Sequence, residues 1–400
     1  MPAPLKGRTR GVHLSSDTIP PAEGLNVYFC KRCLWPTLAF STISSIAIGQ
    51  EVTKLRVVSE ERIPQSVYEQ VAMGGQRDTI QCGVNQSLWF PALRGYSETV
   101  SSLVRYSKKE TVKIDIDSVP ELAHGSIEYY SPSSDGGVLA LVRSVKEYSK
   151  IDGWDNRPQK YGDSFAVKFS PQGKALSVIQ LSVEEAKQPL LKLTGLAELA
   201  NGWMIAGSAL EGDRIRVAIL LFNTSGKFRS SLALPDNVNK ASYSKSAPTM
   251  SVFRPTVVVE PDGTFLVIRG FSDQPIYHIS RTGELLGSIK LNPNGIIFWS
   301  PRIDGTRLFV QVGVSSPQVG ELDRVPIVHP REAFSLFDLA SGSLSNVLTL
   351  DGDIGGTVGC FQNEGVPRLT VVGLGIDGSD SFWTVRVLEP AEKWTTSSVL

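Results

Sequence analysis

The 400-residue sequence predicts an all-β fold built from a repeated four-stranded unit, and three observations lead to this prediction. The segment "PIYHISRTGELLGSIKL" (275–291) reads as two alternating strands joined by a turn at Thr282-Gly283, where glycine supplies the positive φ that such a turn needs. Copies of this hairpin recur along the chain. A second series of hairpins alternates strictly with the first.

The first hairpin series has five members, each a strand, a turn and an alternating strand. Besides 275–291, its members are residues 105–115, 169–181, 222–234 and 337–350. The turn lies at or near glycine in all of them except 105–115, where Lys108-Lys109 takes its place. Repetition of one hairpin indicates a repeat architecture rather than a single β-sandwich.

The second series places Asp-Gly or Asn-Gly between apolar alternating segments, which is the strongest short hairpin signal. Its clear turns begin at residues 135, 201, 262 and 304, and weaker copies begin at 85 and 363. A turn of each series together defines four strands, A to D. Six such units predict a six-bladed β-propeller.

The sixth unit lacks a fourth strand of its own. Residues 51–61 alternate cleanly before the first A strand, so we expect them to pair with residues 382–388 and to close the ring. The predicted propeller domain is 50–392, followed by a C-terminal tail at 393–400. The alternative is a seven-bladed propeller with a degenerate blade between 58 and 82, although "IPQSVYEQVAMGG" there reads as helical or irregular.

One unit carries a resemblance to a known group of propellers. "RPTVVVEPDGTFLVIRG" (254–270), with Pro255 and the Asp262-Gly263 turn between apolar strands, resembles a blade of the six-bladed NHL-like and TolB-like propellers, and the exported bacterial type in particular. Proteins of this group bind proteins, sugars or small ligands, and some are hydrolases or lyases. The resemblance therefore implies a fold and leaves the function open.

Residues 1–49 are predicted to be a leader that ends in an export signal. Lys31 and Arg32 precede an apolar run from Leu34 to Ile48, and Ala47 and Gly49 are small residues at the spacing that a signal peptidase accepts. We expect a cut near Gly49–Gln50 and an exported protein, periplasmic or extracellular. A membrane anchor and a buried apolar segment are the alternatives.

Composition excludes some partners. The formal net charge of the whole chain is zero, and removal of residues 1–49 leaves a slight acidic excess, whereas nucleic-acid binding needs a basic surface. No segment after the leader is apolar for long enough to span a bilayer. A protein or a carbohydrate is the partner that we expect.

The cysteines divide into two pairs. Cys30 and Cys33 lie in the export signal and would be lost with it. Cys82 and Cys360 each stand three residues before a turn of the second series, in blades one and six, which are ring neighbours. An oxidising compartment permits a disulfide bond if the two Cα atoms come within about 7 Å. Two buried thiols are the alternative.

No motif predicts a cofactor. "GLGIDG" (373–378) matches a dinucleotide-binding fingerprint, but a strand follows it instead of a helix, so we expect a glycine-rich loop in blade six. His124, His278 and His329 share no metal-ligand spacing and are expected to be surface or packed side chains. The Asp-rich segments at 351–356 and 375–381 lack the full pattern of a calcium loop, which leaves calcium as the one metal still open.

Two classes of function remain. The first is a binding propeller, which we prefer because the sequence contains no recognisable set of catalytic residues. The second is a hydrolase or lyase that acts on a sugar or lactone at the channel mouth, with Glu128, Glu198 and Glu260 as its carboxylates. These carboxylates occupy no fixed offset from the turns, so ion-paired or solvated side chains are the simpler interpretation.

The insertions predict which face binds a ligand. In this strand order the A–B and C–D turns are short, and the long segments are B–C or D–A connections, at 62–78, 146–163, 182–193, 235–250 and 314–333. Long loops on a rigid scaffold commonly carry binding residues. The predicted binding residues are Trp154, Arg157, Tyr161, Tyr243, Arg324 and His329.

Overall fold

A computed structural model of the chain divides into two compact units, residues 1–48 and 49–400. The described residues all belong to the second unit. They are 52–64, 80–93, 100–108, 110–144, 162–188, 190–211, 214–235, 238–242, 255–260, 262–268, 275–292, 296–304, 306–314, 333–350, 357–362, 366–377 and 380–392. Within these ranges, helices that are long and apolar enough to cross a membrane are absent.

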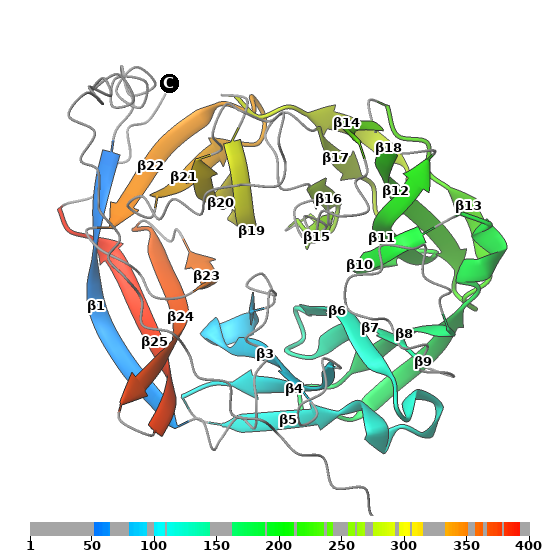
Figure 1. Ribbon diagram of the computed structural model, residues 1–400, viewed down its shortest axis with the longest axis horizontal. Coiled ribbons are helices and arrows are strands. Elements are labelled where there is room, and N and C mark those ends of the chain that lie inside the picture. Colours follow the sequence, from blue (N-terminus) through cyan, green and yellow to red (C-terminus); the bar gives the residue numbers. More distant parts are fainter. Residues whose placement is uncertain are drawn as a thin grey trace, which may run out of the picture. The chain divides into compact units, whose positions relative to one another are not determined.

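The second unit is all-β and is built from antiparallel four-stranded sheets that follow one another along the chain (Figure 1). Blade one contains β2 (Gln81–Cys82), β3 (Leu88–Leu93), β4 (Val100–Tyr106) and β5 (Thr111–Asp115). Blade two contains β6 (Ser126–Pro132), β7 (Val138–Arg143), β8 (Ser164–Phe169) and β9 (Ala175–Leu181). The strands pair in chain order, as in the blades of a β-propeller.

Blades three and four repeat this arrangement. Blade three contains β10 (Leu190–Leu199), β11 (Gly202–Glu211), β12 (Arg214–Asn223) and β13 (Phe228–Ser231). Blade four contains β15 (Thr256–Val259), β16 (Phe265–Ile268), β17 (Ile276–Ile279) and β18 (Leu285–Ile289). Between them β14 (Val238–Ser242) pairs with β12, so part of the predicted loop 235–250 is a strand.

The remaining strands form one eight-stranded sheet. Blade five contains β19 (Ile296–Asp304), β20 (Arg307–Val314), β21 (Ala333–Asp338) and β22 (Leu344–Leu350). Blade six contains β23 (Thr357–Gln362), β24 (Arg368–Asp377) and β25 (Asp380–Pro390), with β1 (Val52–Pro64) beside β25. The predicted glycine-rich loop at 373–378 is therefore wrong, because its residues up to Asp377 belong to β24 and pair with β25.

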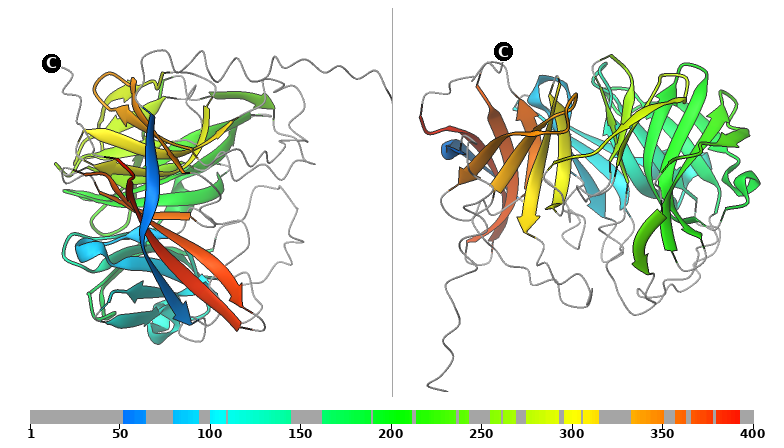
Figure 2. Two further views of the ribbon diagram at one scale, coloured as in Figure 1. Left: turned by 90° about the vertical axis from the view of Figure 1, so that its left-hand side faces the viewer. Right: turned by 90° about the horizontal axis from the view of Figure 1, so that it is seen from above.

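Strand β1 joins blades five and six. It pairs antiparallel with β25 from Leu55↔Pro390 to Pro64↔Phe382, which is the pairing that the sequence predicts; blue β1 lies against red β25 in Figure 2. Its first residues also pair in parallel with β22, from Val52↔Val347 to Leu55↔Leu350. The parallel pairing was not predicted from the sequence, because the alternating pattern of β1 carries no information on a second partner.

Hydrophobic clusters lie between consecutive blades. Trp89 of blade one and Phe169 of blade two share one cluster, and Leu141 and Leu220 mark the next, between blades two and three. Other clusters join blades three and four, four and five, and five and six. A further cluster, which contains Ile63, Val372 and Trp383 together with Leu88 and Phe90, joins blade six to blade one.

The first strands of the blades contact one another in the same order. Strand β6 contacts β2 and β10, β15 contacts β10 and β19, and β23 contacts β19 and β2. The first strand of each blade is thus the one nearest to the other blades. The packing follows from continuous apolar runs such as Val138–Val142 of β7 and Phe265–Ile268 of β16, which place buried side chains on both faces of their sheets.

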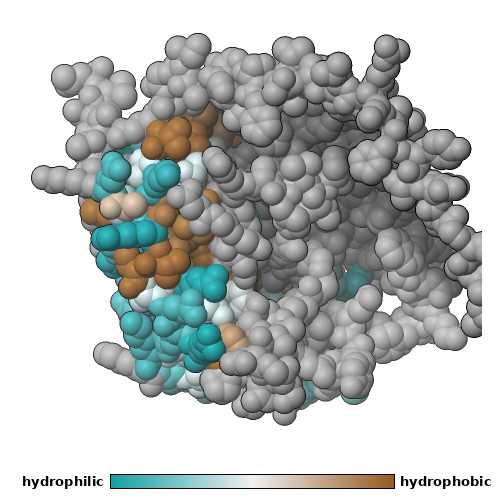
Figure 3. Space-filling view, turned by 60° about the vertical axis from the view of Figure 1, so that its left-hand side comes forward, coloured by the Kyte–Doolittle hydropathy of each residue, from teal (hydrophilic) through white to brown (hydrophobic). Residues whose placement is uncertain are grey.

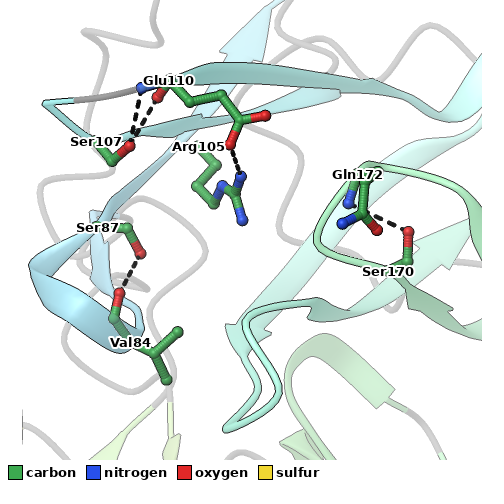
Figure 4. A network of polar contacts seen from close by, with 7 residues as sticks. All are labelled: Val84, Ser87, Arg105, Ser107, Glu110, Ser170 and Gln172. Carbon is green, nitrogen blue, oxygen red and sulfur yellow. Dashed lines mark hydrogen bonds and ion pairs between the residues drawn. The ribbon is translucent and has the colours of Figure 1, made fainter.

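The C–D turns share one hydrogen-bonding pattern. In blades two, three and four, the first residue of the turn donates its N–H to the carbonyl four residues later, as Ser170 does to Lys174, and its side chain accepts backbone N–H groups, as Ser170 Oγ does from Gln172. Figure 4 shows this turn beside that of blade one, where Ser107 and Glu110 bond to each other and Arg105 bonds to Glu110.

Glycine is required in these turns for two reasons. Gly226 in blade three and Gly342 in blade five have φ of 82° and 68°, which L-residues rarely adopt. A Cβ atom on Gly226 would lie 1.9 Å from the carbonyl oxygen of Gln180, and one on Gly342 would lie 2.2 Å from that of Lys290. These two C–D turns therefore pack on the end of the preceding blade, whereas Gly283 of blade four faces Leu199 and Leu221 in earlier strands of blade three.

Short 3-10 helices occupy some connections. They are η4 (Val84–Gln86), η5 (Ile116–Ser118), η6 (Pro120–Leu122) and η7 (Val183–Ala186). Helix η7 lies in the predicted 182–193 connection, which is shorter than expected because β10 begins at Leu190. The predicted 62–78 connection likewise begins later, since β1 continues to Pro64. Residues 65–79, on which the seven-bladed alternative depends, lie outside the described residues.

Candidate functional site

The six predicted binding residues cannot be located. Trp154, Arg157, Tyr161, Tyr243, Arg324 and His329 all lie outside the described residues. The strands on either side of their loops are described, however. Strand β7 ends at Arg143 and β8 begins at Ser164, and these two residues pair with each other. The last described pair of β20 and β21 is Val312↔Ala333. Both B–C loops thus leave from the same end of their antiparallel blades.

A nearly buried ion pair lies at the base of the loop between β7 and β8. Arg143 Nη2 is 2.9 Å from Glu128 Oε1, and the side chains are 17% and 12% exposed. Removing one partner of such a pair leaves an uncompensated charge and is strongly destabilising. The buried hydroxyl of Ser164, opposite Arg143, has no hydrogen-bond partner within the described part of the chain. Glu128 therefore has a structural partner at this end of the blade.

The other two candidate carboxylates also have cationic or polar partners. Glu198 at the end of β10 is half-exposed and lies 3.2 Å from Lys168 Nζ of blade two. Glu260 follows β15 and lies 2.7 Å from His278 Nε2. Glu128 belongs to blade two, Glu198 to blade three and Glu260 to blade four. The structure thus gives each of the three carboxylates its own pair and does not bring them together into one acid–base site.

The Glu260 group is the densest polar cluster among the described residues of blade four. The Thr264 hydroxyl lies 2.6 Å from Glu260 Oε2, 2.7 Å from Asp262 Oδ1 and 2.9 Å from His278 Nε2. Glu260 and Thr264 also close the A–B turn through their backbones. The cluster joins the A–B turn to β17, which explains how His278 becomes a partner of residues in another hairpin.

The geometry of this cluster does not match a nucleophile with its general base. In a hydroxyl–imidazole–carboxylate triad, the hydroxyl bonds to one imidazole nitrogen and the carboxylate bonds to the other. Here Glu260 and Thr264 both approach His278 Nε2. The imidazole therefore cannot accept a proton from Thr264 while its opposite nitrogen is held by Glu260. We interpret the cluster as a set of polar contacts that holds the A–B turn in its conformation.

Hydrogen bonds keep the turn carboxylate of the cluster ionised. Those from the Thr264 hydroxyl and backbone N–H lower the pKa of Asp262, and the nearby charges of His278 and Arg281 act in the same direction. Arg281 lies over Gly263, because a Cβ atom there would be 2.7 Å from Arg281 Nε. The Asp262 side chain is exposed, so these contacts hold the conformation of the turn without burying the carboxylate.

A second set of polar contacts involves residues of β19 and β6, the first strands of blades five and two. Arg302 of β19 donates from Nη2 to the carbonyl of Ile80 at 2.6 Å and from Nε to that of Gly359 at 3.2 Å. One guanidinium of blade five thereby holds backbone atoms of blades one and six. In blade two, the Tyr129 hydroxyl donates to the carbonyl of Val257 in blade four at 2.8 Å. Arg302 thus connects blade five to blades one and six, and Tyr129 connects blade two to blade four.

The environment of these groups disfavours an ionised phenolate. Burial raises the pKa of Tyr129 to about 12, and the bond with Ser131 and the charge of Arg302 offset only part of this effect. Burial also raises the pKa of Tyr130 well above its ordinary value. Both phenols are therefore neutral donors at physiological pH. Nothing in the sequence near Tyr129 or Arg302 distinguishes them from other strand residues, and sequence reasoning missed both.

Cys82 and Cys360 form a disulfide bond, with their Cα atoms 4.9 Å apart. This separation lies within the ordinary range, and the sequence left open whether the first strands of adjacent blades approach so closely. The bond connects β2 of blade one to β23 of blade six, and Cys360 is buried. Of the two alternatives that the sequence allowed, the structure contains the bridge.

The described histidines and acidic residues form no metal site. Groups of three or more His, Cys, Asp or Glu side chains able to hold a metal ion are absent from the described ranges. His124, before blade two, is exposed and has φ of 63°, with its N–H bonded to Asp117 Oδ1. The Asp-rich segment 351–356 lies outside these ranges, and Asp377 and Asp380 form the last pair of a hairpin.

Apolar side chains are exposed on the outer strand of blade six. Val52, Val57 and Val58 of β1 are each more than two-fifths exposed. Figure 3 shows brown surface interrupted by teal on this side of the molecule. Charged residues also lie on β1: Glu60 pairs with Arg386, and Arg62 lies over the Phe382 ring. After Leu55 the strand pairs with β25 alone, and charged residues beside exposed valines there are typical of a protected edge strand.

Comparison with known proteins gives no family. No family model matches the sequence, and no curated protein matches it. Solved structures that resemble it include a Bacteroides caccae protein of unknown function, with 9% identity over 70% of this chain and 88% of the other and a TM-score of 0.40. A Xanthomonas campestris gluconolactonase has 14% identity over 58% and 68%, with a TM-score of 0.33.

A third structure is the PQQ-bound aldose sugar dehydrogenase of Streptomyces coelicolor, with 10% identity over 83% of this chain and 98% of the other and a TM-score of 0.37. These likenesses are too distant to bear on the chemistry of any residue described above. The fold assignment rests on the order and pairing of the strands.

Proposed function

We propose that the protein is an exported six-bladed β-propeller that binds a protein or carbohydrate through the face bearing its long B–C and D–A loops. The observation that carries the proposal is the position of the loop ends. The pairs Arg143↔Ser164 and Val312↔Ala333 flank the two longest B–C loops at the same end of their blades. The A–B and C–D turns at the opposite end of the blades are tight.

The blade count in this proposal is supported by the packing. Consecutive blades share hydrophobic clusters, and the cluster of Ile63, Val372 and Trp383 with Leu88 and Phe90 joins the sixth blade back to the first. The N-terminal strand β1 completes blade six by pairing with β25. Closure of this kind removes the free edges that an open array would leave.

Export is supported by two features of different origin. The sequence before β1 has the pattern of a signal with a cut near Gly49–Gln50. The Cys82–Cys360 disulfide is a bond that persists in oxidising compartments and is rare in the cytosol of mesophiles.

Binding is preferred to hydrolysis because the carboxylates that a hydrolase needs are engaged. Glu128, Glu198 and Glu260 are paired with Arg143, Lys168 and His278, respectively. Catalytic carboxylates of glycosidases act as a facing pair on opposite sides of one bond. The described geometry provides no such pair, so the sugar- or lactone-directed alternative has no observation in its favour.

Capture experiments with matched variants would test the proposed face. The tagged mature chain, 50–400, is used to capture ligands from the exported fraction of its own cells, and a W154A/Y243A variant is compared with it. We expect the variant to lose at least about 1.4 kcal/mol of affinity, a tenfold change, for whatever the wild type captures. Its thermal unfolding should stay the same.

The control variant carries two substitutions at the opposite end of the blades, K174A and E284A, both in C–D turns and both exposed. It should capture as the wild type does. If the control loses capture and W154A/Y243A keeps it, the proposed face is wrong. N-terminal sequencing of the exported protein tests the cut separately, and a mature N-terminus upstream of Leu34 contradicts it.

A further inference from the structure

Polar side chains lie at the loop end of the boundary between blades two and three. Leu139 and Leu141 of β7 and Ala166 of β8 belong to the hydrophobic cluster that these two blades share. Side chains alternate between the faces of a strand, so Arg143 of β7 and Ser164 of β8 point to the same side as these three. Arg143 and Ser164 are also directly paired. The hydrophobic face toward blade three therefore ends in polar atoms.

Glu128 of β6 belongs to the same group. Its Oε1 lies 2.9 Å from Arg143 Nη2, and the side chains of Glu128 and Arg143 remain 12% and 17% exposed. Within the described ranges, Arg143 is the one polar partner of the Glu128 side chain. A carboxylate has two oxygens and about four acceptor positions, so Glu128 can accept a further hydrogen bond from a ligand.

Two buried polar atoms on this side of blade two have no hydrogen-bond partner in the part of the chain that the structure describes. They are Ser164 Oγ and Gln188 Oε1. Leu181, which pairs with Ser164, and Leu190, two residues after Gln188, lie in the same hydrophobic cluster. Buried polar atoms without a bond are destabilising and rare, and each one calls for an explanation. A ligand that supplies hydrogen bonds here would be such an explanation.

The chemistry of the group selects the class of ligand. Glu128 accepts hydrogen bonds, Arg143 donates them, and the Ser164 hydroxyl does both. The charges of Glu128 and Arg143 cancel each other. An anionic ligand would be repelled by the carboxylate and a cationic ligand by the guanidinium. Neighbouring hydroxyl groups of a sugar carry no charge, and each of them both donates and accepts.

The group also lies on the face that we propose for binding. Because β7 ends at Arg143 and β8 begins at Ser164, it forms the base of the long B–C connection of blade two. Resting on the proposed function, we propose that the ligand of this face is a neutral carbohydrate that binds at the boundary between blades two and three. One sugar hydroxyl bonds to Glu128 and Arg143 on their exposed side, and a neighbouring hydroxyl bonds to Ser164.

Calorimetric titration of the full chain with hexasaccharides tests the class of ligand. The neutral probes are hexamers of α-linked glucose, β-linked glucose, xylose and mannose, and the charged probes are hexamers of galacturonic acid and of glucosamine. We expect at least one neutral hexamer to bind, and both charged hexamers to bind at least about tenfold more weakly. Failure of every neutral hexamer to bind, or tighter binding of a charged one, would overturn the proposal.

Ser164→Ala tests the place of binding. The variant removes a hydroxyl that has no partner among the described residues, so its Tm should equal or exceed that of the wild type. Its affinity for the neutral hexamer should fall about tenfold, because one hydrogen bond to the sugar is lost. A purely structural serine would leave the affinity unchanged, and that result would contradict the proposal.

Ser144→Ala is the matched control. Ser144 follows Arg143 directly, its N–H bonds to the Asp163 carbonyl, and its buried hydroxyl likewise has no partner in the described ranges. Alternation places its side chain on the other face of blade two. This variant should bind the hexamer as the wild type does. An equal loss of affinity in Ser144→Ala and Ser164→Ala would refute binding at the boundary with blade three.

Failure of the proposed function gives a different result. If W154A/Y243A weakens the capture of a protein and Ser164→Ala does not, the loop face binds a partner and only the carbohydrate assignment is wrong. If K174A/E284A weakens capture and neither of the other variants does, the proposed face is wrong, and the proposal made here is wrong with it.

Discussion

The interface between blades two and three and the interface between blades six and one use the same kind of strand but are held together differently. The first relies on a hydrophobic cluster and on the packing of Gly226 against Gln180, with Ser182 N–H bonded to the Gly226 carbonyl. The second has a hydrophobic cluster, a disulfide bond, the Arg302 guanidinium on two carbonyls and a hydrogen bond between Tyr106 and Glu61.

The difference follows from chain connectivity. Blades two and three are joined by a short connection, so folding one blade brings the other close. Blades six and one contain segments from opposite ends of the described chain, and Cys82 and Cys360 are 278 residues apart in the sequence. Loop-closure entropy grows with the logarithm of length, which adds roughly 3 kcal/mol at this interface relative to a connection of a few residues. The additional bonds at this interface offset that cost.

The largest expected effect is on the disulfide. Replacing both Cys82 and Cys360 with alanine should lower the free energy of unfolding by about 2–5 kcal/mol, because the bond closes a very long loop. The loss should be local, with faster hydrogen exchange in β24 and β25 than in β11 and β12. Urea unfolding and hydrogen exchange measure the two effects. An unchanged midpoint, or an equal rise in exchange in all blades, would contradict the role that we assign to the bond.

The second prediction breaks the ordinary interface instead. Gly226→Ala should cost about 2–4 kcal/mol, since a Cβ atom would lie 1.9 Å from the Gln180 carbonyl and the residue has positive φ. Gly287→Ala is the matched control, because no atom lies within 4 Å of its Cβ position. Thermal unfolding compares the two variants. If they are destabilised equally, packing of the C–D turn on the preceding blade is not what the glycine provides.

These examples indicate what the sequence could predict. Local signals, namely the turn glycines and the alternation of the strands, identified the hairpins and the pairing of β1 with β25. The equivalent positions of Cys82 and Cys360 in their blades made the disulfide a candidate. Parallel pairing of β1 with β22, and the Arg302 and Tyr129 contacts, join residues that only the three-dimensional packing brings together, and no local pattern encodes them.

The candidate site was less predictable than the fold. Thr264 and Asp262 are close to Glu260 in the chain, but the His278 imidazole joins them only because β16 and β17 pair as Leu266↔His278. The sequence places His278 in a strand and gives no sign of its partner. Conversely, the long loops are obvious in the sequence, and their residues lie outside the described part of the structure.

A third prediction concerns pH and the closing interface. Burial and the Glu61 carboxylate, 2.5 Å from its hydroxyl, raise the pKa of Tyr106 to about 12. The folded state thus retains the phenol proton to higher pH than the unfolded chain, whose tyrosines titrate near pH 10. Stability from this contact should be fully present below about pH 10 and should be lost as the pH rises to about 12. The decline should be modest, since the pair is partly exposed to solvent.

Urea midpoints measured between pH 8 and pH 12 check this prediction, with Tyr106→Phe as the test variant. Phenylalanine keeps the ring and removes the titrating group, so the alkaline loss of stability should become shallower. Tyr277→Phe is the comparison at an ordinary interface, where the hydroxyl bonds to the Pro235 carbonyl and meets no carboxylate in that bond. A slope that changes equally in both variants would show that Glu61 contributes nothing particular.

The smallest expected effect concerns the A–B turn of blade one. Asn85 and Gln86 have φ of 56° and 60°, so two consecutive L-residues occupy the left-handed region. Asparagine tolerates this conformation, whereas glutamine does not, and the stronger copies of this turn have glycine. Gln86→Gly should raise the free energy of unfolding by about 0.5 kcal/mol, the relief of backbone strain less the entropy that glycine adds to the unfolded chain. Asn85→Gly should change it by only a few tenths. Urea unfolding of both variants in the disulfide-bonded protein is the measurement. A destabilised Gln86→Gly variant would contradict the prediction. It would mean that the Gln86 side chain supports the neighbouring Cys82–Cys360 bond, so that the interface between blades six and one extends into this turn.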